Sequence, residues 1–213
     1  MRQSQRFQEP PSFAEEQTLL SQGYNFVAGI DEVGRGALAG PVAAAAVILP
    51  LNLDAPWLSL VRDSKQLSAK KRQFLAQHLR EEALAVGVGM VSHREIDSKG
   101  IIWATRQAMR LATAKLKPTP DFLLIDGLAL PAVKLPQKHI IRGDCLCLSI
   151  ACASIVAKVA RDQLMADLGQ KHPGYSFAAH KGYGTAAHLE ALRRLGVCPI
   201  HRRSFAPVKE LCP

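Results

Sequence analysis

Three apolar segments of this chain each lead into acidic residues, and these acids are its clearest candidates for chemistry. Asp31 and Glu32 directly follow the segment YNFVAGI, and Asp126 follows FLLI. A third segment, HIIRG, leads into Asp144. An acid at a strand end usually forms a turn or caps a helix, so each one alone says little. If the three segments are neighbouring strands of one sheet, the four carboxylates converge at one edge.

Converging carboxylates have a chemical consequence. Like charges repel and resist ionising together, so such a cluster implies either protonation or bound cations. Oxygen ligands favour hard ions such as Mg²⁺ or Mn²⁺, and none of the seven histidines stands at the HExxH spacing typical of zinc. Two divalent ions roughly 4 Å apart can activate a water and stabilise the leaving oxygen of a phosphodiester. The cluster therefore predicts metal-dependent hydrolysis.

The charge balance of the whole chain agrees with a polyanionic substrate. Lys and Arg number 27 against 18 Asp and Glu, which gives a formal net charge of +9. A basic protein attracts phosphates, but net charge alone names no function.

Hydrophobic patterning predicts the elements that position the first acids. Ser12 and Glu15 have the spacing of a capping box, which predicts a short helix that ends near Gly23. YNFVAGI reads as a buried strand, and after the short link GRGALAGP, VAAAAVIL predicts an antiparallel neighbour. Asp31 and Glu32 then lie at the end of the first strand.

Helices and strands alternate further along the chain. Ser68 is placed to cap a helix that precedes the strand VGVGMVS, and Ser92 with Glu95 predicts a capping box for one helix that extends to Pro118. The strands FLLI and HIIRG follow, then a largely buried helix, SIACASIVAKVARDQLMADLGQ, and a final helix, AAHLEALRRLG. This order predicts an α/β fold with a mixed β-sheet flanked by helices, a C-terminal helical segment and a basic tail.

Length and composition limit the organisation of the chain. A chain of 213 residues with 48% hydrophobic content can build one substantial core. We expect an N-terminal extension with a short helix over residues 1–23 and a single domain over residues 24–213. The five cysteines are odd in number and lack CxxC spacing, which favours free thiols in a reducing cytoplasm. The sequence shows no signal peptide or membrane-spanning run, so we expect a cytoplasmic monomer.

The glycines after the first acids admit a rival interpretation. GRGALA matches GxGxxA, the dinucleotide-binding fingerprint. That motif requires a helix to begin there and an acid at the end of the next strand. Gly40 and Pro41 interrupt any such helix, and Asp54 lies in a proline-containing loop. We therefore favour the interpretation that these glycines let backbone groups approach a sugar hydroxyl beside metal-bound phosphate.

Seven motifs in order resemble those of ribonuclease HII. They run from about Val27 to Lys209 and comprise DEVGRG at 31–36, DSKQL at 63–67, IDG at 125–127, GD at 143–144, ASIVAKVARD at 153–162, HKGYGT at 180–185 and HRRSF at 201–205. One such motif would be weak support, but seven in order are specific. The related ribonuclease HIII typically has GTG where this chain has GRG.

The resemblance implies an RNase H-like fold and an endonuclease that cleaves the RNA strand of RNA–DNA hybrids and cleaves 5′ of single ribonucleotides in duplex DNA. It also implies hydrolysis with two divalent ions, Mn²⁺ or Mg²⁺, which activate water rather than the RNA's own 2′-oxygen and leave 5′-phosphate and 3′-hydroxyl ends. No membrane partner is implied.

The resemblance also assigns roles to individual residues. It implies that four acids are catalytic and hold the metals: Asp31, Glu32, Asp126 and Asp144. It implies that six residues bind substrate: Gly34, Arg35 and Gly36 at the 2′-hydroxyl, Tyr183 on the junction sugar, and Ser64 and Lys65 at phosphate. Each role suits the residue type, since a tyrosine ring can test sugar shape and a lysine is a compact charge for a phosphate.

Two other functions stay open at this point. One is a non-catalytic protein that binds RNA–DNA hybrids, and the other is a metal-dependent DNA nuclease or resolvase on a similar fold. A binder could dispense with the acids, and a DNA nuclease has little use for a reader of the 2′-hydroxyl. Both features favour the ribonuclease.

The remaining charged residues have structural interpretations. Lys158 and Arg161 lie in an otherwise apolar helix, and we expect them to pair with nearby acids. Arg202 and Arg203 belong either to a phosphate-facing or structural cluster or to a solvated basic tail. Three histidines at eight-residue intervals are expected on loop and helix surfaces rather than at a metal: His172, His180 and His188.

Overall fold

A five-stranded mixed sheet forms the centre of the protein in the computed structural model, which describes residues 10–212. The strand order is β3-β2-β1-β4-β5. β2 is antiparallel to both of its neighbours, whereas β1, β4 and β5 run parallel to one another. The strands span Val27–Val33 (β1), Val42–Ile48 (β2), Ala85–Val91 (β3), Phe122–Asp126 (β4) and Gln137–Ile140 (β5). The predicted α/β class and mixed sheet are confirmed.

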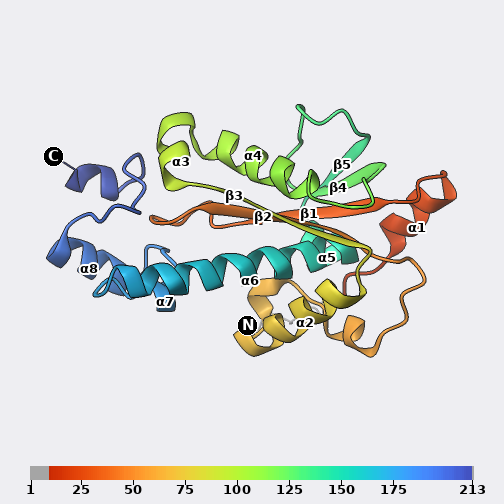
Figure 1. Ribbon diagram of the computed structural model, residues 1–213, viewed down its shortest axis with the longest axis horizontal. Helices are drawn as coiled ribbons and strands as arrows, with labels where there is room; N and C mark the ends of the chain where they lie inside the picture. The colour runs from red at the N-terminus through yellow and green to blue at the C-terminus, as the bar shows by residue number, and fades with distance from the viewer. Residues whose placement is uncertain (1–9, 213) are drawn as a thin grey trace, which may run out of the picture.

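The parallel strands bring the acids to one edge. Because β1, β4 and β5 are parallel neighbours, their carboxyl ends meet on the same side of the sheet (Figure 1). Asp31 belongs to β1, and Asp126 is the last residue of β4. Asp144 differs, because it lies on the short helix α5 (Gly143–Leu146) after β5. The strand predicted at HIIRG is confirmed at its start, because β5 contains His139 and Ile140, whereas Arg142 adopts left-handed backbone (φ 58°) and lies beyond the strand.

Helices cover both faces of the sheet (Figure 1). α4 (Ile101–Thr113) packs against β1, β2 and β3, and α6 (Leu148–Lys171) packs along β1 and β2 on the other face with α2 (Ala69–Glu82) beside it. Successive residues of β2 alternate between the two faces, as the pleat requires. Ala44 and Ala46 pack in the core under α4, whereas Ala45 and Val47 pack in the core with α2 and α6.

Gly29 allows α6 to lie directly on β1. A side chain at this position would overlap the backbone of Ser149 and Ile150 at the start of α6. Asp31 is two residues further along β1 and therefore faces the same helix. The sequence thus places an acid where a long, buried helix passes close to a strand end.

The predicted capping box of Ser12 and Glu15 is wrong. α1 covers Ala14–Ser21, and no side chain caps its first turn. The backbone of Ser12 instead pairs in extended form with the chain around Cys147, and Glu15 forms an ion pair with Lys138 (2.8 Å). Long-range pairing therefore overrides the local signal.

The single helix predicted from Ser92 to Pro118 is two helices. The capping box of Ser92 and Glu95 is confirmed at the start of α3 (His93–Lys99). Gly100 then adopts a φ of 82°, which cannot continue a right-handed helix, so α3 ends and α4 begins there.

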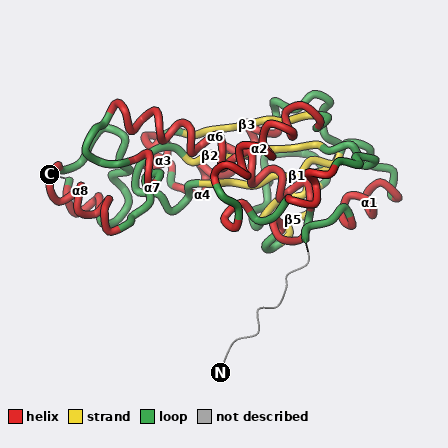
Figure 2. The backbone as a smooth tube through the Cα atoms, turned by 90° about the horizontal axis from the view of Figure 1, so that it is seen from below, coloured by secondary structure: helices red, strands yellow, loops and turns green. Residues whose placement is uncertain are grey.

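A smaller core lies beyond the sheet, at the end of the molecule opposite α1 (Figures 1 and 2). It contains the end of α6 and the C-terminal elements α7 (Phe177–His180), α8 (Ala186–Leu195) and η3 (Val208–Leu211). This arrangement confirms the predicted C-terminal helical segment. The remaining elements are short 3₁₀ turns, η1 (Pro56–Leu60) and η2 (Ser64–Gln66).

His188 is buried in this smaller core, so its predicted surface position is wrong. His188 shares one face of α8 with Ala191 and Leu192, at spacings of three and four residues, and that face points inward. Its ring stacks on His180, with 4.4 Å between ring centres, and its Nε2 lies 3.0 Å from Nε2 of His201.

Three further observations concern membrane-spanning helices, the cysteines and the N-terminal extension. Over residues 10–212, no helix combines the length and the apolar character needed to cross a membrane. All five cysteines are free thiols. The predicted extension over residues 1–23 is covered from residue 10 onward, and its first nine residues lie outside the described part of the chain.

Candidate active site

Three carboxylates from two adjacent strands form the centre of the candidate site. Asp31 and Glu32 come from β1 and Asp126 from the end of β4, and one oxygen of each lies within 4.8 Å of the other two. Ser154, on α6, lines the same cavity as Asp31. The amide of Gly143 donates to Oδ1 of Asp126 (2.7 Å).

Burial makes these acids hard to ionise. Asp31 is 6% exposed, and burial, followed by the charges of Glu32 and Asp126, raises its pKa well above the usual range. Burial also raises the pKa of Glu32 and that of Asp126, although a hydrogen bond from Arg35 opposes the rise at Glu32 and one from the Gly143 amide opposes it at Asp126. Three acids that share one site at a cost in solvation are a marker of a functional centre.

The donor set fits hard divalent cations. Oε2 of Glu32 is buried and finds no hydrogen-bond partner among residues 10–212. A buried carboxylate oxygen without a partner is costly. A cation bound there would satisfy this oxygen and offset the repulsion within the cluster, and an all-oxygen cluster suits ions such as Mg²⁺ and Mn²⁺.

Asp144 lies beside this trio rather than within it. It forms a second group with Asp63 and Cys145, whose ligand atoms are within 4.8 Å of one another. Nζ of Lys65 lies 3.8 Å from Oδ2 of Asp144. Burial, followed by the charge of Asp144, raises the pKa of the Cys145 thiol, so this sulfur is not a ready thiolate ligand. Sequence reasoning missed Asp63, although it is the first residue of the DSKQL motif.

A cavity of about 350 Å³ opens over the carboxylates. Six of the ten residues predicted for the site line it: Asp31, Glu32, Ser64, Lys65, Asp126 and Tyr183. Asp144 does not line the cavity itself but forms an ion pair with Lys65, which does. Gly34, Arg35 and Gly36 form the turn directly after β1. The cavity wall also contains Ser154 and Lys158, which sequence reasoning did not assign to the site although both lie in the quoted motif ASIVAKVARD.

The two residues predicted to hold phosphate have different surroundings. The side chain of Lys65 is 80% exposed, so its charge is available at the cavity rim. Ser64 is 4% exposed, and its hydroxyl shares a 2.8 Å hydrogen bond with the hydroxyl of Ser154. Ser64 therefore ties η2 to α6, which fixes the position of the neighbouring lysine.

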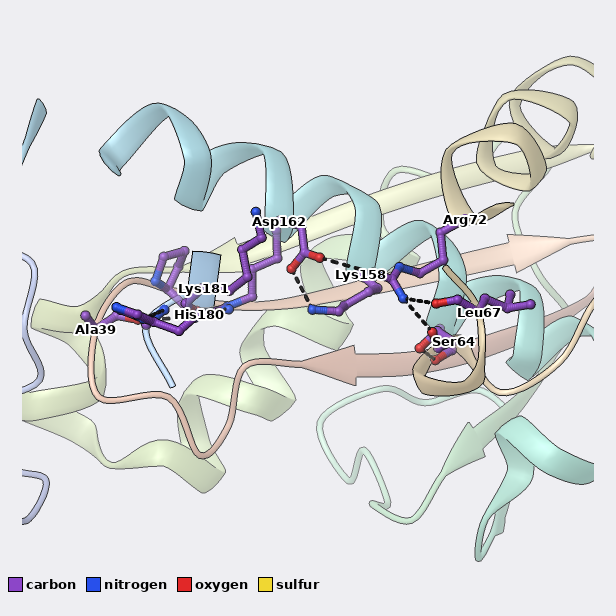
Figure 3. Close-up of polar contacts among 12 residues, drawn as sticks. Ala39, Ser64, Leu67, Arg72, Lys158, Asp162, His180 and Lys181 are labelled. Atoms are coloured by element: carbon purple, nitrogen blue, oxygen red, sulfur yellow. Dashed lines mark hydrogen bonds and ion pairs between the residues drawn. The ribbon is translucent and has the colours of Figure 1, made fainter. Parts of the chain in front are cut away.

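A charged network on the outer side of α6 also holds η2 in place (Figure 3). Arg72 donates to the backbone carbonyls of Ser64 and Leu67, and its second terminal nitrogen lies 3.7 Å from Asp162. Nζ of Lys158 donates to the same carboxylate (2.7 Å), which confirms the predicted acid partner of Lys158. This network borders a groove of about 470 Å³, and Lys158 lines both the groove and the cavity over the carboxylates.

The predicted acid partner of Arg161 is wrong. Over the described residues Arg161 forms no ion pair, and its guanidinium donates to backbone carbonyls instead. Arg202 also donates to backbone carbonyls. Of the two alternatives for the C-terminal arginines, Arg202 therefore belongs to a structural cluster and not to a solvated tail. Arg203 has an exposed side chain, and its backbone amide donates to Asp97.

Comparisons with known proteins point to one family. The family model described as "Ribonuclease HII" matches residues 28–208. Ribonuclease HII of Dehalococcoides mccartyi strain 195 is 54% identical over 201 residues, which cover 94% of this chain and 95% of that protein.

Solved structures agree on the fold. The crystal structure of ribonuclease H2 from Pyrococcus horikoshii is similar with a TM-score of 0.75 and 24% identity, over 88% of this chain and 97% of that one. The ribonuclease HII in a PCNA complex from Archaeoglobus fulgidus is similar with a TM-score of 0.70 and 25% identity, over 84% and 94% of the two chains. The sheet and its covering helices are therefore an RNase H-like fold.

Proposed function

Because the chain belongs to the ribonuclease HII family, whose members are endonucleases that hydrolyse the RNA of RNA–DNA hybrids, we propose that it also cleaves 5′ of a single ribonucleotide in duplex DNA. The products would carry 5′-phosphate and 3′-hydroxyl ends. One juxtaposition carries this proposal. Strand β1 carries two of the clustered carboxylates just before its last residue, Val33. Residues 34–36 follow directly as a glycine-containing turn, and its exposed Gly36 can meet a sugar.

We propose that Asp31, Glu32, Asp126 and Asp144 hold two divalent ions, Mg²⁺ or Mn²⁺. Support comes from the all-oxygen trio, the buried unpartnered Oε2 of Glu32 and the second acidic group around Asp144. When bound, such ions activate water and stabilise the charge on a leaving oxygen. The protein's own part is to present the carboxylates on β1, β4 and α5, so that their oxygens are in place before substrate arrives.

The other cavity residues have complementary tasks in this proposal. Lys65 supplies an exposed positive charge for a phosphate at the rim. Tyr183 lines the cavity, and its ring can pack on the sugar at the junction between ribonucleotide and deoxyribonucleotide. The backbone of Gly34, Arg35 and Gly36 reads the 2′-hydroxyl, which is the group that distinguishes RNA from DNA. Ser64 contributes to phosphate binding by holding η2 against α6.

The proposal also covers the organisation of the protein. We propose that residues 24–213 act as one catalytic domain in a cytoplasmic monomer whose macromolecular substrates are RNA–DNA hybrids and ribonucleotide-containing duplex DNA. The free thiols at all five cysteines suit a reducing compartment.

A panel of duplexes tests the proposal. The substrates are a duplex with one ribonucleotide, its all-DNA copy and a continuous RNA–DNA hybrid, each with Mg²⁺, Mn²⁺ or EDTA. We expect cleavage of the first and third substrates, on the 5′ side of the ribonucleotide in the first, and none in EDTA. Binding without cleavage under every condition would favour a hybrid-binding protein, and cleavage of the all-DNA copy at a similar rate would favour a DNA nuclease.

A further inference from the structure

Two arginines in the protein interior have no acidic partner. Arg161, on α6, and Arg202, in the C-terminal segment, each have 0% exposure, and neither forms an ion pair with any residue in 10–212. Burial lowers the pKa of Arg161, and it lowers that of Arg202 to about 9 with the charge of Arg161 as the next cause. A guanidinium group keeps its proton in proteins, so both side chains carry a positive charge. Two buried like charges without counter-ions require another source of stabilisation.

Backbone carbonyls supply that stabilisation. Arg202 donates to the carbonyl oxygens of Gly34 (2.7 Å), Arg35 (2.8 Å) and Gly40 (3.0 Å). Arg161 donates to a second set of carbonyls: Ala39 (3.1 Å), Pro41 (2.9 Å) and Lys181 (2.9 Å). The two guanidinium groups therefore hold the whole turn from residue 34 to residue 41 from its inner side.

The carbonyls that Arg202 binds determine where the neighbouring amides point. In a trans peptide the C=O of one residue and the N–H of the next point in opposite directions, and both peptides here are trans. Since the carbonyls of Gly34 and Arg35 point inward to Arg202, the amides of Arg35 and Gly36 point outward. Neither amide finds an acceptor in the described part of the chain, and Gly36 is exposed with open space around it.

Arg161 also connects this turn to Tyr183. The guanidinium of Arg161 lies 5.4 Å from the ring centre of Tyr183, and it binds the carbonyl of Lys181 two residues earlier. Ala39 and Lys181 lie close together beside α6 (Figure 3). The two segments proposed to contact the junction sugar thus share one support.

Gly34 completes the fit between the turn and its support. It has a φ of 89°, and a side chain at this position would overlap the guanidinium of Arg161. The first glycine of the GRG turn therefore makes room for an arginine, whereas the exposed Gly36 leaves room for a ligand.

We propose that Arg161 and Arg202 are positioning residues that set the selectivity for the 2′-hydroxyl. They turn the amides of Arg35 and Gly36 outward as two free donors and hold Tyr183 beside them. This inference deepens the proposed function and rests on it. A merely structural role would make the arginines matter for stability but not for discrimination between ribose and deoxyribose.

The test compares Arg202→Lys and Arg161→Lys with wild type on two duplexes that differ by one 2′-hydroxyl. The substitutions keep the charge but lose the forked donors. The affinity for each duplex is measured in Ca²⁺, where we expect binding with little cleavage, and the ratio of the two affinities reports the discrimination. We expect Arg202→Lys to lower this ratio about tenfold and leave affinity for the all-DNA duplex within about twofold. Arg161→Lys should lower the affinity ratio less, because Arg161 does not bind the carbonyls of Gly34 and Arg35.

Arg106→Lys is the matched control, since Arg106 also donates to a backbone carbonyl, that of Ala129, but away from the cavity. It should leave the ratio unchanged. A wild-type protein that neither prefers nor cleaves the ribonucleotide duplex would refute the proposed function itself. A selective wild type with arginine variants that keep the same ratio would refute only the inference.

A measurement on the wild type removes the dependence on variant folding. In ¹⁵N-labelled protein, the amides of Arg35 and Gly36 should exchange rapidly with solvent because they lack acceptors. The ribonucleotide duplex in Ca²⁺ should protect them at least tenfold more than the all-DNA duplex does. Slow exchange in the free protein, or equal protection by both duplexes, would overturn the inference.

Discussion

The protein contains two groups of buried charged side chains, the acidic trio of the candidate site and the two arginines that bind the turn after β1. The two groups differ in how their charges are compensated. The carboxylates of Asp31, Glu32 and Asp126 have raised pKa values, and one oxygen of Glu32 has no partner in the described residues. Arg161 and Arg202 are buried more completely, yet three N–H groups of each guanidinium donate to carbonyl oxygens at 2.7–3.1 Å.

The contrast separates a binding site from its support. The acidic trio keeps uncompensated charge even with the 3.1 Å ion pair from Arg35 to Glu32, and a ligand from outside the chain can compensate it, which is the expected property of a ligand site. Charged groups that the fold compensates fully contribute to a fixed geometry. The comparison predicts that removing a carboxylate affects activity far more than stability, and that removing an arginine affects both.

The largest expected effect is that of Asp126→Asn on activity. The amide keeps the shape and the oxygen that accepts from Gly143, but it removes one negative charge from the proposed metal site. We expect the single-turnover cleavage rate to fall about 10³-fold or more, which corresponds to ~4 kcal/mol. The metal-free protein should be at least as stable as wild type, because like-charge repulsion is relieved.

Single-turnover cleavage in Mg²⁺ and urea unfolding in EDTA measure the two effects. Asp54→Asn is the control, because Asp54 is exposed in a loop away from the cavity. Near wild-type cleavage by Asp126→Asn would show that the assigned site is wrong.

Arg202→Met tests how much the hydrogen bonds of a buried arginine contribute to stability. The variant removes the donors of Arg202 from three backbone carbonyls, of which that of Gly34 keeps a long hydrogen bond from the amide of Ala37, so we expect it to lower the free energy of unfolding by about 3 kcal/mol. The neighbouring exposed arginine provides the control, and Arg203→Met should change stability by less than ~0.5 kcal/mol. Urea unfolding of both variants decides the point, and equal stabilities would mean that the carbonyl contacts of Arg202 contribute little.

Two buried histidines, His201 and His188, form a hydrogen-bonded chain that ends at the backbone of Tyr183. We expect this chain to make the stability of the protein depend on pH. Nδ1 of His201 accepts from the amide of Cys198 (2.9 Å), so its proton is on Nε2, which donates to His188. His188 then donates from Nδ1 to the carbonyl of Tyr183 (3.0 Å). Both rings must therefore be neutral for the chain to exist.

Burial, followed by the charge of His188, lowers the pKa of His201 to about 4. The unfolded chain binds this proton at about pH 6.5, so between about pH 6.5 and 4 it holds more protons than the folded protein. The resulting stability is present above pH 6.5 and is lost as the pH falls through that window, by roughly 3 kcal/mol. His201→Asn should flatten this part of the stability profile, whereas replacement of the exposed His139 by Asn should not. An unchanged slope in His201→Asn would remove His201 from the explanation.

The smallest expected effect is at Tyr183, where the support meets the cavity. Tyr183→Ala removes the ring above Arg161 and should lower single-turnover cleavage of the single-ribonucleotide duplex about tenfold. Duplex affinity should change little, because most of it comes from phosphate contacts. Tyr183→Phe keeps the ring and should lose less if packing dominates. Unchanged cleavage by Tyr183→Ala would reduce this tyrosine to ordinary loop packing.

Local patterns in the sequence predicted the main elements, and the family resemblance supplied the substrate-binding residues of the candidate site. Alternation and apolar runs predicted the five strands approximately, and the caps at Ser68 and Ser92 predicted two helix starts that the structure confirms. Strand periodicity and helix caps depend on spacing along the chain, which the sequence displays directly. The convergence of Asp31, Glu32 and Asp126 was predicted on the condition that their strands are neighbours, and the parallel pairing of β1 with β4 meets that condition.

The tertiary structure alone decided how the remaining charges are used. The sequence shows that Arg161 and Arg202 are basic, but not that carbonyls from a turn more than 100 residues away replace acids as their partners. It likewise does not show that His188 faces inward or that Asp63 joins Asp144. Partners and burial arise when distant segments pack together, and the energy of a charged group depends on those surroundings more than on its neighbours in sequence. The sequence by itself therefore determined the strand-borne acids and the family, whereas packing determined which charges stay open to a ligand and which hold the site in place.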